Sequence, residues 1–443
     1  MPRQPTRWRY LLPFVPGLLG LLVVACGQPP TGTGEVSTAR PAAAEVEATD
    51  ACAGEHWVAA WTGAPQHGSL GRPDDVPFGD ADGLARTFGD QTLRMVVSSR
   101  AAGSALRVLL SNRFGAAPVT FGAVTVAAQG AGADAVPGTM RALTFDGARS
   151  VTVPAGGEVR SDPLDVAVAP FDRLLISFAV AGTGVVLDHH QRAQTTSYAA
   201  PSGSGDHADD DSGAAFTEEL GGWYAVTGLE VLAPRSTGVV VTLGDSITDG
   251  VGSSPNLDRR WPDRLQERLL LAGAPLAVVN AGIAGNHVVT SGLSSVTAIG
   301  PSAVERLDLD ALRVAGVTDL FVFEGVNDLF MSGGEGDIAA RVIAGYEQIV
   351  AEARAAGLRV IGATITPASM SGAREDARLQ VNEWIRTSGA YDAVVDFDAV
   401  TRDPAAPSRL RPEWDAGFAH LNDAGYAAMA AAVPLDAFGG TGC

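Results

Sequence analysis

Cysteine is scarce in this chain: its 443 residues include only three, which leaves room for at most one intramolecular disulfide. Positive charge is also in deficit, with 31 basic against 50 acidic residues and a formal net charge of −19. An acidic surface repels phosphate backbones, which argues against nucleic acid as a partner. Charged residues make up 18% and hydrophobic residues 46%, a balance typical of globular rather than disordered chains.

The N-terminal apolar stretch, residues 11–25, is too short for a comfortable membrane span. Three arginines precede it, the arrangement of a secretory signal peptide. It ends in Val-Val-Ala-Cys-Gly, which resembles a bacterial lipobox, in which the thiol of Cys26 would take a diacylglyceryl group. The sequence therefore predicts an extracellular lipoprotein anchored through Cys26 to the outer face of the bacterial cell membrane. The alternative is ordinary secretory cleavage with an incidental cysteine.

The remaining cysteines, Cys52 and Cys443, stand at the start of the expected folded region and at the last residue. Export would permit a disulfide between them, and that bond would tie the two ends of the mature protein together. We predict this disulfide. Two free thiols at frayed ends are the alternative, because the sequence does not give their separation.

The length suggests two domains. After residues 1–26, residues 27–51 are rich in Gly, Thr, Pro, Ala and Glu and predict a flexible linker. From residue 52 to residue 233, short strand-like runs alternate with turn residues and predict an all-β sandwich. Representative runs are residues 93–97, 106–110 and 174–180. In the same region, His189 and His190 are interpreted as a turn pair, since no ligand spacing supports zinc.

The pattern changes at residue 234. Between there and residue 443, short buried-type strands alternate with helical segments, which predicts a parallel sheet covered on both faces. The predicted strands are residues 239–243, 277–280, 320–323, 358–363 and 393–397. In such sheets the ligand crevice lies beyond the carboxyl ends of the strands.

Four polar or glycine-rich segments fall where loops leave this predicted sheet. Ser246 follows the first strand in Gly-Asp-Ser-Ile, and Gly285 follows the second in Gly-Ile-Ala-Gly-Asn. Asn327 follows the third in Glu-Gly-Val-Asn-Asp, and His420 precedes the last helix. A serine hydroxyl is a weak nucleophile that needs a base within hydrogen-bond reach, and the shared sheet edge gives the two a place to meet.

This ordered set of segments resembles the SGNH branch of the GDSL hydrolases over roughly residues 236–435. The resemblance implies a flavodoxin-like three-layer α/β/α domain with Ser246 as nucleophile and His420 as general base. It also implies an oxyanion hole formed by the Ser246 N–H, the Gly285 N–H and the Asn327 side chain. Each fixed donor at a developing oxyanion can contribute about 3 kcal/mol to transition-state stabilisation.

One position departs from the pattern of these hydrolases. They usually carry the triad acid three residues before the histidine, where this chain has Gly417. Asp415 is therefore the predicted acid, Glu413 is the next candidate, and a dyad oriented by a main-chain carbonyl is the alternative. Asp245 and Asp328 flank the catalytic positions and are predicted to order the strand-end loops through backbone hydrogen bonds.

Together these features predict a monomeric serine esterase that forms an acyl-enzyme on Ser246 and needs no metal or organic cofactor. The expected substrates are carbohydrate acetyl esters or acyl lipids. A non-catalytic glycan-binding lipoprotein, with the β domain as its active part, is one alternative. An acyltransferase that uses the same acyl-enzyme is another.

Overall fold

The computed structural model describes residues 52–67, 86–290, 300–332 and 336–443. The predicted signal peptide, the predicted lipidation site Cys26 and the predicted linker 27–51 lie outside these residues. All of the described residues fall within one unit, Asp50–Cys443. The predicted domain boundary between residues 233 and 234 stays a prediction. Within the described ranges, no helix combines the length and the apolar character needed to span a membrane.

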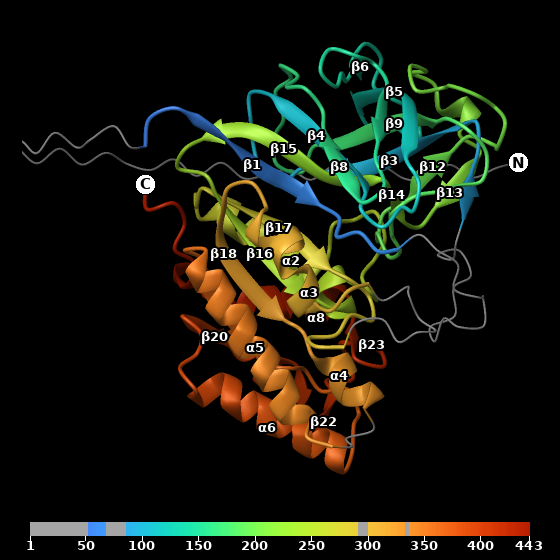
Figure 1. Ribbon diagram of the computed structural model, residues 1–443. Helices are drawn as coiled ribbons and strands as arrows, with labels where there is room; N and C mark the ends of the chain where they lie inside the picture. The colour runs from blue at the N-terminus through green and yellow to red at the C-terminus, as the bar shows by residue number, and fades with distance from the viewer. Residues whose placement is uncertain (1–51, 68–85, 291–299, 333–335) are drawn as a thin grey trace, which may run out of the picture. The chain divides into compact units, whose positions relative to one another are not determined.

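Two antiparallel sheets form the N-terminal region (Figure 1). The first sheet runs in the order β1 (Glu55–Thr62), β15 (Val226–Pro234), β4 (Leu106–Asn112) and β8 (Gly157–Arg160). The second runs in the order β13 (Glu218–Leu220), β12 (Ser197–Ala199), β3 (Gln91–Ser98), β9 (Arg173–Val180), β5 (Val119–Ala128) and β6 (Arg141–Ala142), and β7 (Val151–Val153) also pairs with β5. The predicted runs 93–97, 106–110 and 174–180 lie inside β3, β4 and β9.

Smaller elements complete this region. They are the ribbon of β2 (Thr87–Phe88) with β10 (Val185–Val186), the ribbon of β11 (His189–His190) with β14 (Trp223–Tyr224), and the 3₁₀ turn η3 (Gly213–Ala215). The interpretation of His189 and His190 as a turn pair was wrong. The two histidines form a strand because Trp223 and Tyr224 offer them an antiparallel partner far away in the sequence.

A five-stranded parallel sheet forms the centre of the C-terminal region. Its order is β17 (Leu276–Gly282), β16 (Gly238–Gly244), β18 (Val317–Phe323), β19 (Arg359–Ala363) and β20 (Ala393–Val395). Numbered along the chain this is 2-1-3-4-5, the flavodoxin-like order that the resemblance implies. Each strand lies at one of the five predicted runs. The last ends early, because Asp396 accepts a hydrogen bond from Ala399 N and begins a helix there.

Helices connect and cover these strands. They are α1 (Ser246–Asp249), α2 (Trp261–Leu271), α3 (Ala303–Leu307), α4 (Val326–Met331), α5 (Ile338–Ala355), α6 (Ala373–Thr387), α7 (Phe397–Thr401) and α8 (Asp423–Ala432). Helix α8 packs with α2 and α7, and α5 packs with α3 and α6. Two groups of helices are what right-handed crossovers produce when the strand order reverses at β16.

Several short elements were not expected from the sequence. They are the π-helical turn η5 (Asp308–Leu312), the 3₁₀ turn η6 (Leu435–Ala437), the hairpin of β21 (Arg402–Asp403) with β22 (Ala406–Leu410), and the hairpin of β23 (Asp415–Gly417) with β24 (His420–Leu421). The last of these hairpins carries His420.

The antiparallel and parallel regions share polar contacts across β1. The N–H of Ala59 donates to the carbonyl of Ala315 at 2.8 Å, and Thr62 Oγ1 donates to the carbonyl of Asn280 at 2.9 Å. Arg100, just beyond β3, pairs with Asp263 in α2 at 2.7 Å, and both side chains are buried. The N-terminal region therefore contacts the loops and helices around the parallel sheet directly.

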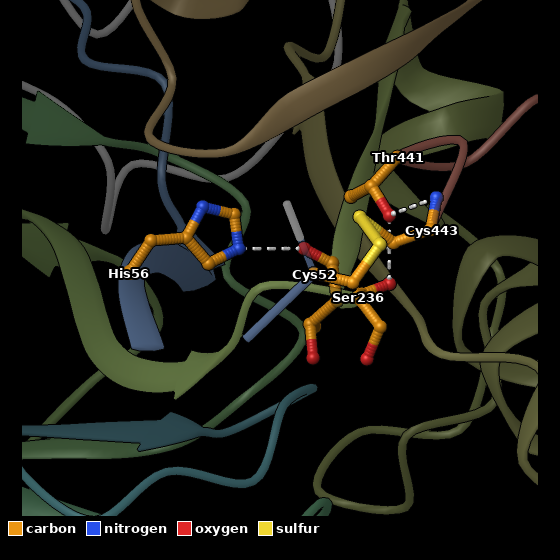
Figure 2. The surroundings of a disulfide bond; sticks show 6 residues. Cys52, His56, Ser236, Thr441 and Cys443 are labelled. Carbon is orange, nitrogen blue, oxygen red and sulfur yellow. Dashed lines mark hydrogen bonds between the residues drawn. A yellow bond between two sulfur atoms is a disulfide. The ribbon is translucent and has the colours of Figure 1, made fainter. Parts of the chain in front are cut away.

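The predicted disulfide between Cys52 and Cys443 is present, with the two Cα atoms 5.4 Å apart. Figure 2 shows that neighbouring hydrogen bonds support the same junction. The backbone N–H of Cys443 donates to Thr441 Oγ1 at 3.3 Å, and that hydroxyl donates to the carbonyl of Ser236 at 3.2 Å. The bond joins positions 391 residues apart in sequence, so it closes nearly the whole folded region into one loop.

Candidate active site

Ser246 is the first residue of α1, one residue after Asp245 caps the helix. Asp245 Oδ1 accepts the backbone N–H of Ile247 at 2.9 Å, which fixes the turn between β16 and α1. At Gly244 a Cβ atom would lie 2.2 Å from Thr248 Oγ1 and 2.4 Å from the carbonyl of Phe323, so this turn requires glycine. The serine hydroxyl is thereby held at the carboxyl edge of the parallel sheet.

His420 lies within hydrogen-bond distance of this serine, with Nε2 2.9 Å from Ser246 Oγ. Burial and, to a smaller extent, the nearby positive charge of Arg192 lower the pKa of His420 to about 4. The charge of Asp249 and a hydrogen bond with the backbone of Gly417 act in the opposite direction. The imidazole is therefore neutral near pH 7 and able to accept the serine proton.

The structure does not bring the predicted acid Asp415 to the imidazole. Its Oδ1 accepts the backbone N–H of Gly417 at 2.7 Å, and its side chain is exposed. Within the described residues, neither Asp415 nor Glu413 forms a hydrogen bond or ion pair with His420. The histidine ring instead lies near the backbone of Gly417, where φ is +103°. L-amino acids rarely adopt this φ, which explains why this position carries glycine rather than aspartate.

Of the two remaining predicted oxyanion donors, Asn327 lies in helix α4 and Gly285 lies in a loop that this helix contacts. Asn327 Nδ2 donates one hydrogen to the carbonyl of Asn286 at 2.8 Å, and an amide group has a second hydrogen to offer. Asn286 directly follows Gly285, which has a φ of +81°. Asp328 accepts the backbone N–H groups of Val288 at 2.8 Å and Val289 at 3.3 Å. Helix α4 therefore holds the loop that carries the Gly285 N–H.

Sequence reasoning missed Arg306, a buried arginine in α3. Its guanidinium donates to the carbonyl of Gly244 at 3.0 Å and to the carbonyl of Ala281 at 2.6 Å, near the carboxyl ends of β16 and β17. Its Nε donates to Asn286 Oδ1 at 2.9 Å. One side chain thus connects the serine turn with the loop of Gly285 and Asn286. No periodicity or motif signalled it, since a single arginine in a short helix resembles a surface residue.

Three buried carboxyl groups, those of Asp245, Glu324 and Asp328, interact with one another near the site, and the charge of Arg306 acts on the first two. Burial raises the pKa of Asp328 to about 6. Burial also raises the pKa of Asp245 and of Glu324, and the repulsion between these acids adds to the effect. Glu324 Oε2 lies 3.9 Å from the guanidinium. Because none of these carboxyl groups forms a hydrogen bond or ion pair with Ser246 Oγ or His420 within the described residues, they order the site and do not act as its acid.

A separate cavity of about 160 Å³ is bounded by strands of the first antiparallel sheet and by the end of β17. Trp61, Arg113, Arg160 and Glu230 are among its lining residues, whereas Ser246 and His420 are not. Two of its arginines are paired with acids, Arg113 with Asp310 at 2.6 Å and Arg160 with Glu230 at 3.2 Å. The reacting groups therefore lie elsewhere. In the described ranges, no three or more His, Cys, Asp or Glu side chains are grouped so as to hold a metal ion.

A serine and a neutral histidine in hydrogen-bond contact at the carboxyl edge of a flavodoxin-like sheet define the site of a serine hydrolase. Residues 242–428 match the GDSL-like lipase/acylhydrolase family. This match identifies a carboxylic ester hydrolase.

No curated protein matches the chain. Among solved structures, the acetyl xylan esterase AlAXEase is 20% identical over 44% of this chain and 96% of its own, with a TM-score of 0.33. A GDSL-like lipase from Bacteroides thetaiotaomicron VPI-5482 is 16% identical over 44% of this chain and 84% of its own, with a TM-score of 0.32. Likenesses this weak add nothing to the family match.

Proposed function

We propose that Ser246 and His420 hydrolyse carboxylic esters through an acyl-enzyme. The observation that carries the proposal is the 2.9 Å contact between Ser246 Oγ and a neutral His420 Nε2. His420 takes the serine proton while Oγ attacks the acyl carbonyl carbon and forms a tetrahedral oxyanion. The protonated histidine then donates that proton to the departing alcohol, which leaves the acyl group on Ser246.

The second half of the reaction repeats these steps with water as the nucleophile. His420 takes a proton from water, the hydroxyl attacks the acyl carbonyl, and the serine oxygen leaves with the proton to release the acid. In both halves the oxyanion is stabilised by the Ser246 N–H, the Gly285 N–H and the second hydrogen of Asn327 Nδ2. The contact between Asn327 and Asn286 supports this assignment, because it fixes the amide beside the Gly285 loop.

The base is oriented by main chain, so the site operates as a dyad. The nearness of the Gly417 backbone to the His420 ring supports this interpretation, as does the bond of the Asp415 carboxylate to the Gly417 N–H instead of to the ring. If the Gly417 carbonyl holds Nδ1–H, then Nε2 carries the free lone pair that faces Ser246 Oγ. The chemistry needs neither a metal ion nor an organic cofactor.

The proposed substrates are carbohydrate acetyl esters or acyl lipids, and the proposed location is the outer face of a bacterial membrane. The signal-peptide pattern and the lipobox-like Cys26 support that location. We propose a monomer in solution. Hydrolysis is preferred to acyl transfer because water needs no dedicated acceptor site.

Release of p-nitrophenol from an acyl series, acetyl to dodecanoyl, tests the function in the mature protein. We expect hydrolysis, with an optimum at acetyl for a carbohydrate esterase and at longer chains for a lipase. In parallel, a fluorophosphonate probe should add one phosphonyl group on the peptide that contains Ser246, located by mass spectrometry. The proposal would be refuted if the protein hydrolysed no ester of the series and formed no adduct on Ser246. An added alcohol acceptor that diverts product to a new ester would indicate transfer.

Asp415→Asn is expected to change kcat/KM by less than about threefold, because surface substitutions without buried partners have small effects. In a triad whose acid contacts the histidine, the same type of change lowers kcat about 10⁴-fold. Glu413→Gln, which changes the other nearby exposed carboxylate, is the matched control. A loss of about a hundredfold or more in Asp415→Asn alone would make Asp415 the triad acid and refute the dyad.

A further inference from the structure

A histidine from the antiparallel region reaches α1. His190 is in strand β11, whose partner is β14, and its ring lies 5.2 Å from that of Trp223. His190 Nε2 lies 3.0 Å from Asp249 Oδ1. Asp249 is the last residue of α1, three positions after Ser246. The two side chains are only 4% and 2% exposed, so the pair is closed to solvent.

Both nitrogens of the His190 ring face acceptors. Nδ1 lies 2.9 Å from the carbonyl of Ala64, and a carbonyl oxygen can only accept. Nε2 faces a carboxylate, which also accepts when ionised. The ring therefore carries a proton on each nitrogen and is a cation that balances the charge of Asp249. The negative charge of Asp249 accordingly raises the pKa of His190 against the opposing effect of burial.

The second oxygen of Asp249 holds the loop after β17. Asp249 Oδ2 accepts the backbone N–H of Ala284 at 3.0 Å, and Ala284 directly precedes Gly285. The same segments are held together in two further ways. Asn280 Nδ2 donates to the carbonyl of Thr248 at 2.7 Å. The backbones of Gly282 and Asp249 also approach closely, since a Cβ at Gly282 would lie only 2.4 Å from Asp249 N. The direction of the Gly285 N–H therefore depends on where the carboxylate of Asp249 is held.

We propose that His190 is a positioning residue of the ester-hydrolysing site, acting through Asp249 and Ala284 on the oxyanion donor Gly285 N–H. This inference rests on the proposed function. It gives the N-terminal region a defined role: its strand β11 supplies the cation that fixes a carboxylate inside the catalytic domain. The region thus completes the site without touching the substrate.

His190→Gln tests the proposal in the full mature chain. Glutamine can reach Asp249 with one N–H but carries no charge, so it leaves a buried carboxylate uncompensated and the Gly285 loop less tightly held. We expect kcat to fall about 10- to 100-fold, because one misdirected oxyanion donor has an effect of that order. KM should stay within about twofold, since the donor acts on the transition state rather than on bound ester.

Arg100→Gln is the matched control. It removes another buried ion pair between the two regions, Arg100 with Asp263 at 2.7 Å, but this pair contacts neither Asp249 nor the Gly285 loop. We expect its melting temperature to fall while kcat remains within about twofold of the parent. If His190→Gln behaved in the same way, with lowered Tm and unchanged kcat, the pair would only join the regions and the proposal would be overturned.

The double variant His190→Gln/Asp249→Asn keeps the proposal testable if His190→Gln alone does not fold. The asparagine introduced by the second substitution can still accept the Ala284 N–H through its Oδ1. Its Nδ2 can donate to the amide oxygen of the introduced glutamine, so no buried charge is left unpaired. We expect this variant to fold and to recover a large part of kcat relative to His190→Gln alone. Recovery of Tm without recovery of kcat would contradict the proposal. Absence of turnover in the parent protein would instead refute the proposed function. Failure of the proposed function can therefore be distinguished from failure of the positioning role of His190.

Discussion

Ser246→Ala is expected to lower kcat at least about 10⁴-fold on any ester that the parent protein hydrolyses, the largest effect predicted for this chain. The hydroxyl is the only group of Ser246 that can form the acyl-enzyme, and alanine removes it without changing the backbone N–H. Because Ser246 is small and lies at the start of a helix, the variant should keep the parent's melting temperature within a few degrees. Initial rates with the best p-nitrophenyl ester measure this.

His420→Ala should produce a loss of similar size, and the double variant should lose little more. Nucleophile and base act as a unit, so removing the second after the first costs almost nothing further. Additive losses would show that the two residues act separately. An active Ser246→Ala protein would place the nucleophile elsewhere, and circular dichroism of each variant would show whether lost activity reflects lost folding.

A related prediction concerns how the activity of the parent protein depends on pH. The pKa of His420 is lowered to about 4, so the base is neutral above that value and is lost as pH falls through it. Activity should therefore persist at pH 5, where an unperturbed imidazole with a pKa near 6.5 is mostly protonated. The unfolded chain binds this proton more readily than the folded one, so this group also weakens folding as pH falls from about 6.5 toward 4. Because folding weakens in this range, rates below pH 5 should be measured within seconds of diluting the protein into the acidic buffer. A midpoint near pH 6.5 would contradict the buried, neutral base.

The parallel sheet could be predicted from the sequence for a physical reason, whereas the pairing of Ser246 with His420 was implied by the resemblance to the SGNH hydrolases. Buried parallel strands read as short apolar runs, and the residues after them meet at one edge. Ser246 and His420 are 174 positions apart, yet the expectation of a shared edge holds. The antiparallel runs were equally clear, because turn residues bound each of them.

The acid could not be predicted, because its position depends on a backbone angle. The hairpin of β23 and β24 gives Gly417 and Phe418 positive φ values of +103° and +59°. That turn directs the Asp415 carboxylate to the Gly417 N–H, not to the ring. A count of residues between acid and histidine contains no such information.

The roles of His190 and Arg306 could not be predicted from the sequence for another reason. Each is a single polar residue in a short element, β11 or α3, whose burial comes entirely from distant segments. Apolar periodicity cannot indicate such positions. A buried cation becomes visible only once its partners, Asp249 for the histidine and Glu324 for the arginine, are placed beside it.

Arg306→Met is expected to lower the free energy of unfolding by about 3–5 kcal/mol, the largest stability effect among the substitutions considered. Methionine fills much of the same volume but cannot donate to the carbonyls of Gly244 and Ala281. It also leaves Glu324 without the one ion pair that it forms within the described residues. Asp310 keeps Arg113 at 2.6 Å, so its charge remains compensated. Denaturation in guanidinium chloride measures the loss.

Arg313→Met is the matched control, seven residues along the chain. Its side chain is 68% exposed and pairs with Asp308 at the surface, so the same substitution should change stability by no more than about 0.5 kcal/mol. Equal losses in the two variants would mean that Arg306 contributes nothing beyond an ordinary surface arginine. Any Arg306→Met protein that folds should also show reduced kcat, because both the serine turn and the Asn286 loop lose a donor.

The dependence of this loss on pH separates charge from hydrogen bonding. Burial already raises the pKa of Glu324, and removing Arg306 raises it further, because the arginine favours the ionised form. The folded variant then holds a proton that the unfolded chain releases above about pH 4.3, so its stability falls as pH rises. The deficit relative to the parent should therefore be larger at pH 8 than at pH 5. Adding Glu324→Gln to Arg306→Met should recover part of the stability at pH 8 and little at pH 5. A deficit equal at both pH values would assign the loss to the carbonyl contacts of Gly244 and Ala281, and the charge of Arg306 would then be incidental to its role.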